Sequence, residues 1–108
     1  MGQYITQAEA DANLIVELER IQRLVLNTVR VDLNPHQLGA LVSLVYNAGS
    51  RVITQSTLSR KLNPGDYAGA AFEFPRWNKA HQGGQLVALP ELTTRRLNEQ
   101  KLFLTPTN

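Results

Sequence analysis

Apolar residues along the first third of the chain recur at a helical period. They fall at Ala10, Leu14, Leu18, Ile21, Val25 and Val29, close to one residue per turn on a single helix face. Ahead of them, Thr6 and Glu9 have the three-residue spacing of a capping box. This pattern predicts one long amphipathic helix of about six turns. Its polar side chains, which include Glu17, Glu19, Arg20 and Arg23, are expected to face solvent.

A second helix is indicated by Asn34 followed by Pro35. Asparagine is a favoured N-cap, and proline suits the first helical position. From Leu38 to Val45 the sequence is apolar with little polar interruption, and Gly49 can end the helix in a conformation with positive φ. Because a helix that is apolar nearly all round belongs inside a fold, this segment is predicted to be the buried central helix.

The remaining pattern predicts shorter elements. A helix over residues 58–62 is expected to start at Ser56 or Thr57, and Asp66 is expected to cap a piece that ends before Pro75. The segment 82–85 reads as a flexible turn with brief extended pairing on either side. A last helix is predicted from near Pro90 to Phe103, and residues 105–108 are expected to fray. The predicted fold class is all-α.

Composition restricts the chain to one ordinary globular domain. It has 108 residues, of which 43% are hydrophobic and 19% are charged. The formal charge is +2 and the pI about 9.3, with no block of basic residues, so neither nucleic acid nor a membrane is expected as a partner. With no cysteine and two separated histidines, we expect no metal site and no cofactor.

Candidate catalytic residues find weak support in the sequence. Most of the nine carboxylates are explained by exposed helix faces or caps. Glu73 stands beside an Arg-Trp pair, and Glu91 falls in the first turn of the last helix, where negative charge is stabilising. The serines lack a nucleophile turn, and His36 and His81 read as a first-turn residue and a loop residue. We therefore expect no catalytic residue within the chain.

Four segments carry a resemblance to a known family. They are "ITQAEADANL", "LNPHQLGALVSLVYNAG", "STLSRKLNPGDYAGAAFEFPRW" and "LPELTTRRLNEQKLF". In this order they resemble phage lysozymes of the T4/lambdoid endolysin type, which are muramidases among the glycoside hydrolases. The resemblance runs from about residue 4 to residue 104. It implies the helical lobe of a lysozyme, with a long first helix, a buried central helix and several short helices.

The resemblance also implies what is missing. In that family the catalytic Glu, the Asp or Cys, and the Thr precede the segment matched by residues 5–9. No residue of this chain inherits those roles, so we expect residues 1–108 to form a single truncated phage-lysozyme-like domain. The resemblance places Tyr46 and Asn47 at a helix end that faces glycan, and matches Arg95 and Arg96 to paired arginines near the catalytic region. Those two arginines are otherwise interpreted as surface or helix-terminal charges, and Trp77 as a core residue.

Three functions remain open on the sequence. The first is a catalytically incompetent lysozyme-like protein directed at peptidoglycan. The second is one half of a two-chain muramidase, and the third is a binding, inhibitory or adaptor protein. A lost lobe exposes the apolar surface that it covered, so we expect self-association or a protein partner near the first helix and Tyr46. The start "MGQYITQAEAD" has no signal-peptide pattern, which predicts a cytoplasmic phage or prophage product in its bacterial host.

Overall fold

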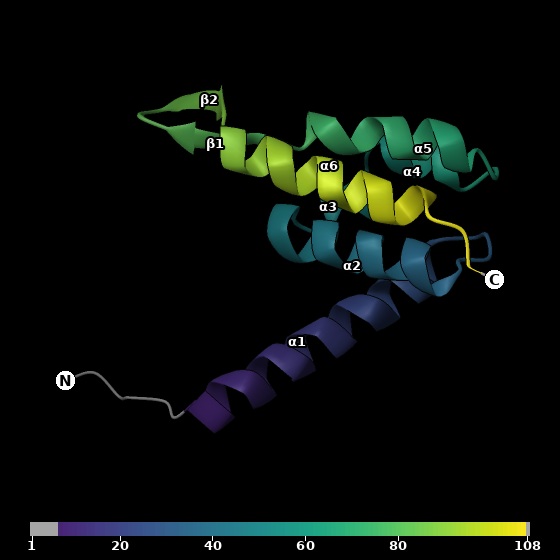
Figure 1. Ribbon diagram of the computed structural model, residues 1–108, viewed down its shortest axis with the longest axis horizontal. Coiled ribbons are helices and arrows are strands. Elements are labelled where there is room, and N and C mark those ends of the chain that lie inside the picture. The colour runs from purple at the N-terminus through teal and green to yellow at the C-terminus, as the bar shows by residue number, and fades with distance from the viewer. Residues whose placement is uncertain (1–6, 108) are drawn as a thin grey trace.

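The computed structural model describes residues 7–107, and the side chains of residues 12–107. Its first element is the long helix α1 (Gln7–Thr28), which confirms the predicted helix. The capping box expected at Thr6 and Glu9 falls outside the described side chains. Figure 1 shows α1 running obliquely away from the other helices, which lie side by side. Among the described side chains of α1, the buried ones are Ile21 and Val25, in its C-terminal part.

The central helix is α2 (Pro35–Ala48), and both of its ends follow the sequence prediction. The Asn34 side chain accepts a hydrogen bond from the backbone N–H of Gln37 at 2.7 Å. In return, the Gln37 side chain accepts one from the backbone N–H of Asn34 at 2.9 Å. At the other end the Gly49 N–H donates to the Val45 carbonyl. Gly49 has a φ of 102°, a backbone conformation that favours glycine. Local side-chain chemistry thus sets where α2 begins and ends.

Three short helices follow α2 and close one side of the core. They are α3 (Arg51–Thr54), α4 (Thr57–Leu62) and α5 (Tyr67–Glu73), with a 3₁₀ turn η1 (Phe74–Arg76) after them. Ser56 caps α4 and Asp66 caps α5, as their positions in the sequence predict. The sequence interpretation missed α3, although Val52 and Ile53 within it are buried.

A two-stranded antiparallel hairpin precedes the last helix. Strand β1 (Lys79–Gln82) pairs with β2 (Gln85–Ala88), with His81 opposite Leu86. The turn between them is Gly83-Gly84, both with positive φ, so the predicted extended pairing is confirmed. His81 lies in strand β1 and not in a loop. Figure 1 shows the hairpin projecting from one end of the body.

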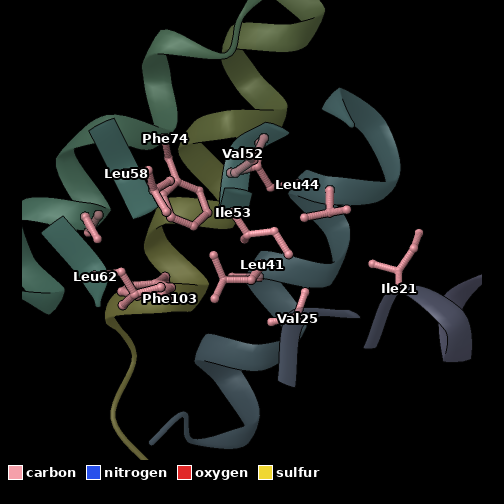
Figure 2. Packing of buried hydrophobic residues seen from close by; sticks show 14 residues of the cluster. Ile21, Val25, Leu41, Leu44, Val52, Ile53, Leu58, Leu62, Phe74 and Phe103 are labelled. Atoms are coloured by element: carbon pink, nitrogen blue, oxygen red, sulfur yellow. The ribbon is translucent and has the colours of Figure 1, made fainter. Parts of the chain in front are cut away.

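The last helix, α6 (Pro90–Leu104), packs against α2. It also contacts α5 and η1, and so joins the central helix to the short helices. Figure 2 shows apolar side chains from α1 to α6 converging on one cluster. Near its centre the Phe74 and Phe103 rings lie 5.3 Å apart between centroids, a common aromatic packing geometry. Trp77 packs against the edge of this cluster and stays partly exposed. The fold is the predicted all-α body with one small hairpin.

Candidate functional site

The most unusual feature between α2 and α6 is a buried ion pair. The inner face of α6 carries Leu92, Arg96, Glu99 and Phe103 at helical spacing. Arg96 is fully buried, at 0% exposure, and Glu99 is 5% exposed. The interpretation of Arg96 as a surface or helix-terminal charge is therefore wrong. It occupies a core position on α6, because its charge is matched by Glu99 one turn further along the helix.

The pair is held at several points. Arg96 Nε lies 2.7 Å from Glu99 Oε1, and Arg96 Nη2 donates to Glu99 Oε2 at 3.1 Å. The Ser43 hydroxyl of α2 donates to the same Oε2 atom, and Arg96 Nη1 donates to the Trp77 carbonyl at 3.2 Å. The network thus ties α6 to α2 and to the segment after η1.

Burial dominates the electrostatics of this network. It raises the pKa of the Glu99 carboxyl above its ordinary value, while the Ser43 hydrogen bond and the charge of Arg96 act in the opposite direction. Burial also lowers the pKa of the Arg96 guanidinium, which its interactions with Glu99 partly offset. The arrangement keeps two charges out of water at a desolvation cost, which is the usual situation for a buried ion pair.

Two hollows meet this network from different sides. The first, which we call the α2–α6 hollow, has a volume of about 420 Å³ and includes Ser43, Glu91, Arg95 and Glu99 in its lining. The second, which we call the basic groove, has a volume of about 640 Å³ and is bounded by the end of α2, α3, η1, the hairpin and the start of α6. Glu99 lines the first hollow and Arg96 the second, so the ion pair lies between them.

The basic groove combines cationic side chains with an apolar wall. Its basic side chains are Arg51, Arg76, Lys79, His81 and Arg96, and among the described residues that line it none is acidic. Trp77, Leu86, Leu89 and Leu92 supply the apolar wall. A third, smaller hollow of about 270 Å³ has Glu73 and Arg76 in its lining.

The predicted glycan-contact residues divide between these features. Asn47 and Arg96 both line the basic groove, whereas Arg95 is exposed and lines the α2–α6 hollow. Tyr46 is 50% exposed and is not among the residues that line these three hollows. At this exposure Tyr46 is not a core aromatic residue. The structure therefore brings Asn47 and Arg96 together in one groove and leaves Tyr46 and Arg95 outside it.

The sequence did not identify Ser43 and Glu99 as members of the ion-pair network. It also did not identify Arg51 or Lys79 as residues of the basic groove. The signal for Glu99 was available, because an Arg and a Glu three residues apart interrupt the apolar stripe that ends at Phe103. The contact with Ser43, which lies 56 residues away in the chain, has no local signature. The cations of the groove come together only through the fold.

A metal site is not supported by the described residues. Among them there is no group of three or more His, Cys, Asp or Glu side chains that could hold a metal ion. His36 lies in the first turn of α2, as predicted, and is partly buried there, with Nδ1 3.0 Å from the Thr105 carbonyl oxygen. Within the described part of the chain, no helix has the length and apolar character required to cross a bilayer.

Comparison with protein families identifies the relationship. The family model for phage lysozyme matches residues 1–99. The chain belongs to the phage lysozyme family. Its relatives include an endolysin from Acyrthosiphon pisum secondary endosymbiont phage 1, 42% identical over 95% of this chain and 70% of the relative. A SAR-endolysin from Enterobacteria phage P21 is 38% identical over 96% of this chain and 61% of the relative.

Solved structures give the same family relationship. The muramidase domain of SpmX from Asticaccaulis excentricus is similar with a TM-score of 0.86 and 38% identity, covering 97% of this chain and 71% of that domain. An endolysin from Escherichia coli O157:H7 phage FAHEc1 has a TM-score of 0.86 and 31% identity, covering 96% and 66%. The lysozyme-like helical fold is confirmed. The chain spans 70% of the length of the endolysin from the endosymbiont phage. It spans 38% of the length of an endolysin from Bacillus phage PZA.

Proposed function

We propose that this phage lysozyme-family chain binds peptidoglycan and that its own 108 residues do not hydrolyse it. Family membership supports the substrate class, since the similar proteins are endolysins and a muramidase domain. The proposal that hydrolysis is lacking rests on one observation, namely how the carboxylates that line the three hollows are placed and paired.

Glycoside hydrolysis normally needs two carboxyl groups facing the same sugar bond, about 5–9.5 Å apart. The α2–α6 hollow contains two, Glu91 and Glu99. They are eight residues apart on one helix, which places their backbones about 12 Å apart along its axis. Glu99 is also bound to Arg96 and Ser43. This pair therefore does not have the arrangement that the reaction requires.

The other two hollows contain fewer carboxylates. Among the described residues that line them, the basic groove has no carboxylate, and the smallest hollow has Glu73 alone. Glu73 is 4% exposed and has Lys61 Nζ at 2.8 Å and Arg76 Nε at 3.3 Å. Each oxygen of the Glu73 carboxylate is thus engaged by a cation, and among the described residues that line this hollow no second carboxylate faces it. The described residues that line these hollows therefore support binding of the polymer and do not supply the paired carboxyl groups that cleavage requires.

The binding surface that we propose lies around the end of α2. Tyr46 exposes half of its surface, and Asn47 borders the basic groove. An exposed aromatic ring and an amide at the same helix end suit a sugar polymer that presents both apolar ring faces and hydroxyl groups. Co-sedimentation with purified peptidoglycan tests this half of the proposal. Protein that remains in the supernatant at every polymer concentration would contradict it.

An observation on α1 favours a protein partner as well. Leu14, Ile15 and Val16 are 41%, 55% and 64% exposed on the part of α1 that extends from the body. Adjacent exposed apolar residues of this size mark interaction surfaces in soluble proteins. We propose that a second copy of the chain covers them, and a separate chain that supplies catalytic groups is the alternative outcome of the same test.

A further inference from the structure

We propose that the outer face of α1 from a second copy of the chain docks in the α2–α6 hollow, antiparallel to α6. The inference rests on the self-association proposed for α1 and identifies the surface that receives this helix. It starts from a stripe of exposed side chains on α1 at intervals of four, three and four residues, which are Ala12, Val16, Glu19 and Arg23. This spacing places all four on one face of the helix.

The stripe on α1 faces away from the body of its own chain. Arg23 is two positions from Ile21 and two from Val25, which corresponds to a rotation of about 200° around the helix axis. Ile21 and Val25 are the side chains that α1 buries in the core. Figure 1 shows that α1 also runs obliquely away from the other helices. A partner for this stripe therefore has to come from another molecule.

A matching stripe lies on α6 in the α2–α6 hollow. Its members are exposed and line this hollow of about 420 Å³, and they are Glu91, Arg95, Asn98 and Leu102. Their intervals are again four, three and four residues, so both stripes are about 17 Å long. Intervals of three and four residues are those at which two packed helices contact each other. The chain therefore carries two exposed stripes of equal length and spacing.

The charges of the two stripes are complementary when the helices run in opposite directions. On both helices the Glu precedes the Arg by four residues. In an antiparallel pair Glu19 therefore lies opposite Arg95, and Arg23 lies opposite Glu91. A parallel pair would place like charges opposite each other. None of these four residues forms an ion pair with another described residue, so both pairs are available to the contact between copies.

The same register brings apolar side chains into the hollow. It places Ala12 opposite Leu102 and Val16 opposite Asn98, with Ile15 beside the stripe between Ala12 and Val16. Val16, Ile15 and Leu102 are exposed in the single chain. Burial of these side chains supplies the driving force for association, and the two ion pairs select the direction and register of the helices.

Exchange of charges tests the register by sedimentation equilibrium of the intact chain. Arg95→Glu places a negative charge opposite Glu19 and should weaken self-association about fivefold. Glu19→Arg should weaken it by a similar factor, and Arg95→Glu/Glu19→Arg should restore the affinity of the wild type. The control Arg95→Glu/Asp32→Arg has the same net charge as the restored variant. It should stay weak, because Asp32 is exposed in the connection between α1 and α2, outside both stripes.

Trapping with cysteines tests the contact itself, because the chain has no cysteine of its own. A mixture of Val16→Cys and Asn98→Cys chains, one of them isotopically labelled, should form a disulfide-linked heterodimer under mild oxidation. The control replaces Asn98→Cys by Leu97→Cys, at a neighbouring exposed position that does not line the hollow. This mixture should form little heterodimer.

The outcomes separate the inference from the self-association on which it rests. A chain that stays monomeric at high concentration would overturn both. If Ile15→Glu/Val16→Glu abolishes association and Arg95→Glu leaves it unchanged, α1 associates through a different surface and the inference alone is overturned. Restored and control double variants of equal affinity would overturn it as well, as would equal heterodimer yields in the two cysteine mixtures.

Discussion

The Arg96 guanidinium and the Glu99 carboxylate form a two-point ion pair inside the helical body, with contacts of 2.7 and 3.1 Å. Both residues lie on α6, and Ser43 of α2 donates a third contact to the carboxylate. The pair separates the α2–α6 hollow from the basic groove. Its integrity therefore bears on the shape of both hollows, of which the basic groove borders the binding surface that we propose.

Removal of the cation from this pair should destabilise the fold. In Arg96→Met, Glu99 stays buried without its counter-charge, and breaking a buried pair in this way costs about 3–5 kcal/mol. The free energy of unfolding in urea at pH 7 measures the loss. The neighbouring Arg95→Met is the control, since Arg95 is exposed and its replacement should change stability by less than about 0.5 kcal/mol. Equal effects of the two variants would show that the pair has no special role.

The pH dependence of stability should report the raised pKa of Glu99. Since burial raises that pKa above the ordinary 4.5, the folded chain binds the proton more tightly than the unfolded chain. The stability contributed by this group is complete below pH 4.5 and is lost as pH rises through the raised value. Glu99→Gln has no such group, so the Tm of the wild type should fall relative to that of Glu99→Gln as pH increases.

Thermal unfolding from pH 4 to pH 8 measures this difference. Glu91→Gln, on the exposed first turn of the same helix, should keep the pH dependence of the wild type. A wild-type Tm that rises relative to Glu99→Gln with increasing pH would mean that the folded state lowers the pKa of Glu99, contrary to our account.

Loss of the side chains at the end of α2 should weaken binding to peptidoglycan. Tyr46→Ala removes an exposed ring and Asn47→Ala removes an amide beside the basic groove. If each contact contributes about 1 kcal/mol, each variant should bind roughly fivefold more weakly in co-sedimentation. Phe72→Ala, which removes a 75% exposed ring on α5, is the control and should bind like the wild type. A similar loss in all three variants would place binding elsewhere.

Self-association through α1 stays a prediction that light scattering can test. The 12.0 kDa chain should show a concentration-dependent increase in mass, because association buries Leu14, Ile15 and Val16. Ile15→Glu/Val16→Glu should remain monomeric, while Asn13→Glu/Gln22→Glu, at exposed polar positions of the same helix, should associate about as readily as the wild type. A wild type that stays strictly monomeric at high concentration would contradict self-association and favour a different partner.

The sequence predicted those parts of the fold that depend on neighbouring residues. The caps at Asn34, Ser56 and Asp66 were correct because each is a contact between residues three positions apart. The sequence interpretation missed α3, since Val52, Ile53 and Thr54 are β-branched and have modest helix propensity. Burial of Val52 and Ile53 against the core stabilises that helix instead.

The site was less predictable because its residues meet through tertiary structure. Asn47 comes from the end of α2, Arg96 from the middle of α6, and Arg51, Arg76 and Lys79 from three further elements. No spacing along the chain indicates that these cations face one groove. The buried pair likewise depends on Ser43, which donates to Glu99, and on the Trp77 carbonyl, which accepts from Arg96. No local pattern connects either residue to the pair.

The central claim is that these 108 residues bind peptidoglycan without cleaving it. The most direct measurement incubates the purified chain with peptidoglycan and records, in the same sample, the sedimented protein and the soluble muropeptides released. We predict protein in the pellet and no release above that of a protein-free sample. Release that grows with time, and that Glu73→Gln or Glu99→Gln abolishes, would identify a working acid within the chain and contradict the account.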